Sequence, residues 1–144
     1  MDGESIDAFL AERRNGILAT VNRRGEPVQV PVFFDWYEGT IYISVTTQRG
    51  FYPNLQPNPQ VSLCVDDAGL PVRTVIARGE ARVIEDESIW THTRRIIDKY
   101  VPAEQVEATL ERMHGEPRVV LAIKPRMISS WSPTPDDREV WHAD

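Results

Sequence analysis

Apolar and polar residues alternate over several short stretches in the first half of the chain. These stretches cover residues 17–21, 27–34, 40–45 and 60–65. A period of two is typical of a strand with one buried face. The connections between the first three stretches are short and contain Gly25 and Gly39, and such short turns can join antiparallel strands but not parallel ones. The pattern therefore predicts an antiparallel meander, with which a barrel or a sandwich begins.

The second half of the chain contains both predicted helices and predicted strands. Apolar residues recur every three or four positions over residues 86–100, and again between Pro102 and Gly115. The remaining predicted elements are a short amphipathic helix at 5–14 and strands at 72–83, 118–123 and 127–131. Gly79, inside the longest strand, indicates a bend where a barrel turns or a ligand approaches. We expect an α+β domain, a small antiparallel β-barrel with peripheral helices.

The composition limits the class of protein. With 144 residues, 41% of them hydrophobic and 26% charged, the chain fits one globular domain, which we place at residues 1–132 with a loose tail at 133–144. The net charge of −6 argues against nucleic-acid binding, which needs a positive face. No apolar run approaches the roughly 18 residues of a membrane span. A lone Cys64 excludes an internal disulfide and indicates a reducing cytoplasm.

One loop carries the residue types that bind a phosphate. The strand at 40–45 leads into Thr46, Thr47, Arg49 and Gly50. The hydroxyls donate hydrogen bonds, the guanidinium forks onto oxygens, and a glycine lets the backbone approach closely. The same residues also fit an ordinary polar loop with a solvated arginine. The loop alone leaves both interpretations open.

Other kinds of chemistry lack their signatures. No histidine, cysteine or aspartate pair has metal-ligand spacing, so we predict no metal. The chain has no Gly-x-Ser-x-Gly elbow of a serine hydrolase and no Gly-x-Gly-x-x-Gly nucleotide turn. If the protein is an enzyme, a cofactor must supply the reactivity, and the chain supplies orientation and electrostatics.

A resemblance to a known family extends over most of the chain, from about residue 9 to residue 131. It is carried by LATVNRRGEPVQVPVFF, GTIYISVTTQRG, NLQPNPQVSLCVDD, ARGEARVIED, RRIIDKYV and RVVLAIKPRMISSW, in this order. The set resembles the pyridoxamine 5'-phosphate oxidase-like split-barrel proteins, and is most similar to their flavin and deazaflavin (F420) branch. The resemblance implies a six- to seven-stranded antiparallel split β-barrel of the FMN-binding kind, usually one half of a homodimer with the cofactor at the interface.

The resemblance also implies a cofactor site. The ring would lie against the second strand and the phosphate over the third strand and its loop. The residues placed there are Gln29, Val30, Pro31, Val32, Ser44, Thr46, Thr47, Arg49, Gly50, Phe51 and Asn54. Phe51 stands where relatives often have a lysine, and an aromatic ring cannot replace that charge. Phe51 and Tyr52 either pack on the cofactor or cover the core.

The implied activity is hydride transfer between reduced coenzyme F420 and an unidentified small organic substrate, without an identified catalytic residue. The alternatives are an FMN-binding oxidoreductase and a non-catalytic cofactor- or haem-binding barrel. Thr46, Thr47 and Tyr52 are candidate proton donors. The residues expected along the coenzyme's polyanionic tail are Arg13, Arg14, Arg23 and Arg24, and Trp131 is expected nearest the partner's cofactor.

Overall fold

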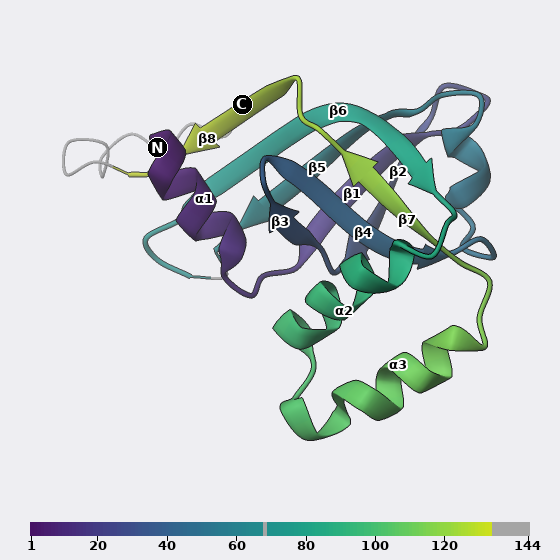
Figure 1. Cartoon of the computed structure of the whole chain (residues 1–144). Coiled ribbons are helices and arrows are strands. Elements are labelled where there is room, and N and C mark those ends of the chain that lie inside the picture. The colour runs from purple at the N-terminus through teal and green to yellow at the C-terminus, as the bar shows by residue number, and fades with distance from the viewer. Residues whose placement is uncertain (68, 134–144) are drawn as a thin grey trace.

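The computed structural model describes residues 1–67 and 69–133 and shows a curled, antiparallel sheet with helices on its periphery (Figure 1). The strands are β1 (Gly16–Val21), β2 (Pro27–Val32), β3 (Asp35–Tyr37), β4 (Thr40–Thr46), β5 (Gln60–Asp66), β6 (Thr74–Ile84), β7 (Arg118–Ile123) and β8 (Met127–Trp131). The helices are α1 (Gly3–Ala11), α2 (Ile89–Tyr100) and α3 (Val106–His114), with short 3-10 helices η1 (Tyr52–Leu55) and η2 (Ala103–Gln105).

The predicted fold class is confirmed, because the strands follow the order β2-β1-β5-β6-β7-β4-β3 and the strand pairings in the described part of the chain are antiparallel. Eight strands lie in the described part of the chain, one more than expected. The additional strand is β3, which has only three residues and is too short to show an alternating pattern. The tail expected at 133–144 lies outside the described residues from residue 134 onward.

β6 closes the barrel because it belongs to both halves of the sheet. Its first part pairs with β5 and β8, and its last four residues pair with β7. The change falls at Gly79, where a Cβ atom would come within 2.9 Å of the carbonyl oxygen of Lys124. The bend that the sequence indicated at this glycine is therefore a corner of the barrel, at which two backbone segments cross closely.

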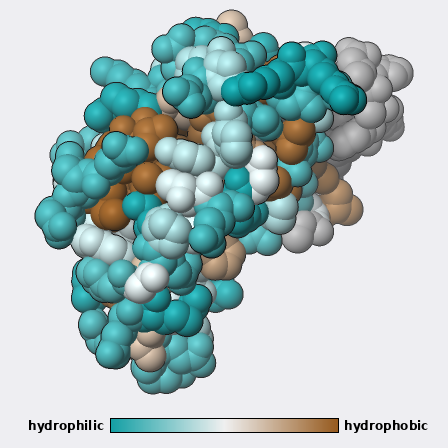
Figure 2. All heavy atoms as spheres, turned by 90° about the vertical axis from the view of Figure 1, so that its right-hand side faces the viewer, coloured by the Kyte–Doolittle hydropathy of each residue, from teal (hydrophilic) through white to brown (hydrophobic). Residues whose placement is uncertain are grey.

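The alternating strands bury one face each, as their sequences predict. The inward side chains include Leu18, Ile43, Leu63, Val75 and Leu121, all at most 1% exposed. Burying a side chain of this kind stabilises the fold by roughly 1.5–3 kcal/mol. Figure 2 shows that hydrophobic side chains remain visible on the barrel, whereas the helical part below it is mainly hydrophilic.

The two later helices cover one outer face of the sheet and frame the candidate site. Figure 1 shows α2 and α3 together on one side of the barrel. α2 packs on β4 and β7, where the Thr93 hydroxyl donates a hydrogen bond of 2.9 Å to the Ser44 Oγ. α3 packs on α2 through a small core around Ile97 and Leu110, and Trp90 stacks on His114 at 3.5 Å between ring centroids. These contacts fix both helices at the edge of a cleft.

Candidate functional site

A cleft of about 610 Å³ opens between the sheet and the helices α2 and α3. Its sheet side is lined by Pro31, Val32, Ser44, Arg49 and Arg118, and its helical side includes Ile96, Ile97, Tyr100, Thr109, Arg112 and Met113. One end is therefore rich in arginine and hydroxyl groups, while the wall towards the helices is mostly apolar. Cofactor sites of proteins commonly combine an apolar wall with a few polar groups in this way.

The structure brings four of the expected cofactor residues into this one cleft. Pro31 and Val32 come from the end of β2, and Ser44 comes from β4, on the face covered by α2. Arg49 comes from the loop after β4. The segments expected to hold a ring and an anion therefore face the same space.

The other expected residues lie outside the lining of the cleft. Phe51 is 3% exposed and belongs to the barrel core, so its side chain lies in the core rather than in the cleft. Asn54 donates a hydrogen bond of 3.1 Å from Nδ2 to the Thr20 Oγ1, which ties η1 to β1. Thr47 donates its backbone N–H to the carbonyl oxygen of Pro117 at 2.9 Å, which joins the loop to the start of β7.

Gln29 and Val30 lie earlier on β2 than the cleft. The pairing of β1 with β2 places Gln29 opposite Ala19 and Val30 opposite Leu18. Because Leu18 points into the core, Val30 faces inward and Gln29 faces outward. Gln29 therefore shares the outer face of the sheet with Pro31, two residues further along the strand.

Arg118 is a site residue that the sequence did not reveal. It begins β7 and pairs with Thr46 of β4. Its guanidinium donates to the Ser44 Oγ at 3.2 Å and to a carboxylate oxygen of Glu116 at 3.0 Å. Only 12% of its side chain is exposed. In the sequence, Arg118 is only a single base at the start of an apolar strand. Its position beside Ser44 follows from the pairing of β7 with β4, which the sequence does not show.

The Nε–H of Arg118 is buried without a hydrogen-bond partner among the residues that the structure describes. Burial lowers the pKa of the Arg118 guanidinium, although Glu116 acts in the opposite direction. An arginine stays charged in proteins even so. A buried donor without a partner costs free energy that a bound acceptor would recover. The group is therefore suited to an anionic ligand.

Positive charge exceeds negative charge at this end of the cleft. Arg49, Arg112 and Arg118 line it, and Glu116 forms ion pairs with two of them, at 3.2 Å to Arg112 and at 3.0 Å to Arg118. Arg49 is exposed and lies near enough to Arg118 to contribute to the lowering of its pKa. The three arginines give this end of the cleft a net positive charge.

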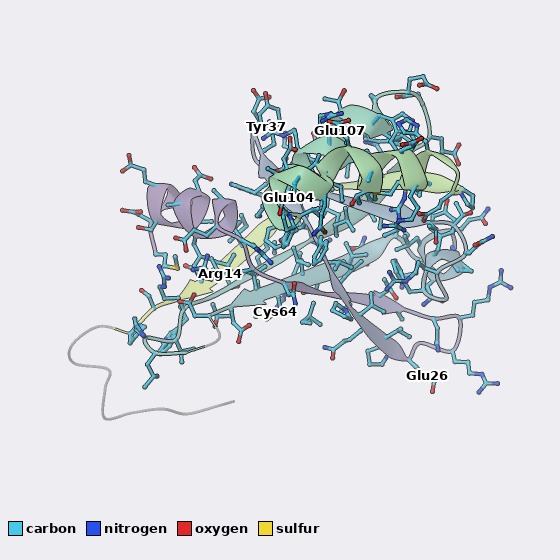
Figure 3. All side chains as sticks on the ribbon, turned by 90° about the horizontal axis from the view of Figure 1, so that it is seen from below. Arg14, Glu26, Tyr37, Cys64, Glu104 and Glu107 are labelled. Atoms are coloured by element: carbon cyan, nitrogen blue, oxygen red, sulfur yellow. The ribbon has the colours of Figure 1, made fainter. Side chains whose placement is uncertain are left out.

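The four arginines expected along a polyanionic tail are not gathered in one place. Arg14 is 11% exposed and forms ion pairs with Asp67 at 2.8 Å and Glu12 at 2.7 Å, so its charge is used within the fold. Arg23 and Arg24 lie in the turn after β1, and the length of this strand places them roughly 20 Å from Arg14. In Figure 3, Arg14 lies near α1, and Glu26 of this turn lies at the far tip of the hairpin.

Arg13 and Arg14 both line a second hollow beside the cleft, together with Asp66. This hollow has a volume of about 400 Å³ and shares Asn15, Phe33 and Tyr100 with the cleft. Phe33 is 47% exposed and its ring stacks on that of Tyr100 at 4.2 Å. The two spaces therefore adjoin across an exposed aromatic ring.

The candidate proton donors Thr46, Thr47 and Tyr52 are not part of the cleft lining. The phenol that does line it is Tyr100, which donates to the carbonyl oxygen of Arg14 and accepts from the backbone N–H of Phe34. Burial raises the pKa of Tyr100 to about 12. This phenol holds α2 against the barrel and is a poor acid at neutral pH.

The described part of the chain offers neither a cluster of metal ligands nor a membrane-spanning helix. Within residues 1–67 and 69–133, no three histidine, cysteine or acidic side chains are placed to hold a metal ion. No helix there has the length and apolar composition to cross a bilayer. Cys64 is half-buried. Its burial, and to a smaller extent the charge of Asp66, raises the pKa of its thiol, so the thiol is a weak nucleophile.

Comparison with known proteins identifies the family. The family model for pyridoxamine 5'-phosphate oxidase matches residues 3–132. No curated protein sequence matches the chain. A solved conserved hypothetical protein from Mycobacterium tuberculosis has a TM-score of 0.81 at 22% identity, over 100% of this chain and 91% of that one.

Two further solved structures carry functional descriptions. An F420 reductase is 25% identical, with a TM-score of 0.67 over 85% of this chain and 94% of that one. A putative pyridoxamine 5'-phosphate oxidase from Listeria innocua is 21% identical, with a TM-score of 0.68 over 88% and 95% of the two chains. The fold and its cleft thus define a split-barrel protein of the flavin-binding oxidoreductase class. The chain belongs to the pyridoxamine 5'-phosphate oxidase family.

Proposed function

We propose that this protein is an oxidoreductase that transfers a hydride between coenzyme F420 and a small organic substrate. The observation that carries the proposal is the arginine end of the cleft, where the Arg118 Nε–H is buried without a partner beside Ser44 and Arg49. The similarity to an F420 reductase supports the choice of the deazaflavin. The bound coenzyme would supply the hydride, and the chain would bind and orient it.

The residues of the cleft fit such a coenzyme by their chemistry. Arg118 and Arg49 would hold the phosphate together with the Ser44 hydroxyl, since charge-assisted hydrogen bonds are the strong ones. Pro31 and Val32 would support one face of the ring system. Side chains of α2 and α3 such as Ile97 and Met113 would keep water away from it, which strengthens the electrostatic interactions at the arginine end.

The adjoining hollow offers a path for the anionic tail of the coenzyme. It leads from the cleft past Phe33 to Arg13. Arg13 takes part in no ion pair among the described residues, in contrast to Arg14. We assign the tail to Arg13 and exclude Arg14, Arg23 and Arg24 from this role.

We further propose that two copies of the chain associate through the outer face of β2, β1, β5, β6 and β8. The strand pairing aligns Pro31, Ile17, Cys64, Ile76 and Ser129 in one row across this face, and Gln29, Ala19, Ser62, Arg78 and Met127 in the next. These two rows contain one charged residue, Arg78. Ile17 is 37% exposed and Met127 is 52% exposed. A sheet face of this extent with one charged residue favours burial against a partner.

This dimer would complete the site. Gln29 and Pro31 belong both to the face and to the strand assigned to the ring. Trp131 at the end of β8 is 36% exposed and lies at the border of the same face, opposite Thr74. A second copy would therefore cover the ring from the side that the cleft leaves open, and Trp131 is the side chain expected nearest the partner's cofactor.

Titration of the purified apoprotein tests the function. We expect the fluorescence of F420 to be quenched on binding, with a micromolar or lower dissociation constant, and FMN to bind more weakly. Arg118→Gln should weaken F420 binding by about tenfold or more, and Arg23→Gln, in the hairpin turn, should leave it unchanged. Tighter binding of FMN than of F420 would make the protein an FMN enzyme. A haem absorption band, or no binding of either compound, would overturn the proposed activity.

A further inference from the structure

A second basic groove lies on the barrel beside the cleft. It has a volume of about 480 Å³ and is lined by Tyr42, Gly79, Glu80, Arg82, Lys124 and Arg126, among others. None of its lining residues belongs to the cleft. On β4, Tyr42 of the groove and Ser44 of the cleft are two residues apart, and α2 covers both through His92 and Thr93. The groove is thus a separate feature of the surface.

The charges in this groove are unbalanced. Three bases face one acid, Glu80, whose carboxylate accepts a hydrogen bond of 2.8 Å from the Gln60 Nε2. The other atom of the same amide, the Gln60 Oε1, accepts a hydrogen bond from Arg126. Gln60 therefore links Glu80 to Arg126. The side chains of Lys124 and Arg82 have no hydrogen bond or ion pair with any residue in the described ranges, although Arg82 lies near Asp86.

The backbone holds the bases of the groove in place. The corner between β7 and β8 crosses β6 so closely at Gly79 that the Lys124 carbonyl oxygen leaves no room for a Cβ atom. The same corner is fastened by a hydrogen bond of 2.9 Å from the backbone N–H of Arg126 to the carbonyl oxygen of Arg78. Lys124 and Arg126 therefore project from a fixed corner, and Arg82 projects from β6 beside them.

An aromatic ring forms a further wall. The ring of Tyr42 is stacked on the imidazole of His92, with 4.0 Å between centroids and 10° between planes. This contact holds the ring of Tyr42 against α2. The groove thus combines a fixed aromatic wall with arginine and lysine side chains from two different elements. On a chain with a net charge of −6, such a local excess of positive charge attracts multiply charged anions.

We propose that this groove binds a small organic compound with two adjacent phosphate groups. Arg82 and Lys124 would contact the phosphates, the arginine through its planar fork and the lysine as a point charge. Glu80, whose carboxylate accepts a hydrogen bond from Gln60, would repel a ligand that places negative charge beside it. A volume of about 480 Å³ exceeds the size of a single phosphate group. The charged residues of the lining are exposed, so they are accessible in the folded chain.

Calorimetric titration with inorganic pyrophosphate and with ADP tests this proposal. We expect pyrophosphate to bind, ADP to bind more tightly, and the affinity of both to fall with added salt. The double variant Arg82→Gln/Lys124→Gln should lose affinity by about tenfold or more, since two charge-assisted contacts are removed. Arg23→Gln in the hairpin turn is the matched control and should bind as the wild type does. Arg118→Gln, in the cleft, should keep the binding that the double variant loses.

The two sites are distinguished by these variants. Loss of binding in Arg118→Gln alone would mean that the probes enter the cleft, and would overturn the assignment of a separate site. Undetectable pyrophosphate binding, or equal affinity in the double variant, would overturn it as well. Because Arg82, Lys124 and Arg23 are exposed, the double variant and Arg23→Gln should unfold at the same urea concentration as the wild type. The outcome is independent of F420 binding.

Discussion

Arg118 and Ser44 are 74 positions apart in the chain, and the guanidinium of the first donates a hydrogen bond of 3.2 Å to the hydroxyl of the second. The contact exists because β7 and β4 pair antiparallel with Val120 opposite Ser44 and Arg118 opposite Thr46. A second hydroxyl, that of Thr93 on α2, donates to the same Ser44 oxygen at 2.9 Å. Ser44 thus joins the sheet, the helix and the arginine at one point of the cleft.

The first prediction concerns the buried guanidinium. Arg118→Lys keeps a positive charge but removes the planar fork that reaches Ser44 and Glu116 together. We expect this variant to bind F420 with an affinity between those of the wild type and Arg118→Gln. Fluorescence titration of the three proteins measures the order. Equal affinities of the lysine and glutamine variants would show that the fork, not the charge, holds the ligand.

The second prediction concerns the exposed guanidinium of the loop. Arg49→Ala should weaken F420 binding by about tenfold or more, because a charge-assisted contact contributes roughly 1.5–3 kcal/mol. The stability of the fold should not change, since Arg49 is exposed. Fluorescence titration and urea unfolding check the two parts. Arg24→Ala, in the hairpin turn, is the control. An unchanged dissociation constant for Arg49→Ala would remove this residue from the site.

The sequence predicts the features that depend on neighbouring residues in the chain, and it does not predict those that depend on residues far apart. The alternation in residues such as Leu18 and Leu63 is local, so strands and their buried faces could be read directly. The residue types of the loop around Arg49 could also be read directly, because its residues are consecutive, and the anion binding that they indicate stays a prediction. Arg118 was not, because its meaning comes from a strand partner far away in the sequence. The burial of Phe51 in the barrel core could not be predicted from its place in the loop sequence.

A third prediction tests the barrel corner. In Gly79→Ala the new Cβ atom would lie 2.9 Å from the Lys124 carbonyl oxygen, a backbone atom that cannot rotate away. We expect the free energy of unfolding to fall by about 1–3 kcal/mol, as for other overpacked sites. Urea unfolding followed by tryptophan fluorescence measures it. Gly50→Ala is the control and should change stability little, because the space that its Cβ atom would take is open. Equal stability of both variants would mean that the corner is free to shift.

A fourth prediction concerns Lys99, whose ammonium donates to the carbonyl oxygens of Leu10 at 2.9 Å and Phe34 at 3.1 Å. Burial lowers the pKa of Lys99 to about 8, from an ordinary 10.5. Between these two values the unfolded chain binds more protons than the folded chain, so the free energy of unfolding rises with pH. The wild type should therefore gain stability relative to Lys99→Met as the pH rises from about 7.5 to about 9.5.

Urea unfolding at several pH values measures this difference. The loss of two hydrogen bonds in Lys99→Met shifts its stability by an amount that does not depend on pH, so the readout is the change in the gap between the two proteins. The comparison stops below pH 10, because burial raises the pKa of Tyr100 to about 12 and this phenol then acts in the opposite direction. A constant gap between wild type and variant would contradict the prediction.

The last prediction tests the proposed pairing of two chains through the outer face of the barrel. Ile17 lies in the middle strands of this face, between Pro31 and Cys64, and is 37% exposed. Ile17→Asp would place a charge where a second copy excludes water, and burying an unpaired charge is costly. We expect light scattering to give the mass of two chains for the wild type and of one chain for the variant, which should also bind F420 more weakly. Leu70→Asp changes a residue that is 92% exposed and outside the face, so it should keep the mass of two chains. A wild-type protein with the mass of one chain, or an Ile17→Asp variant with that of two, would show that this face does not hold the second copy.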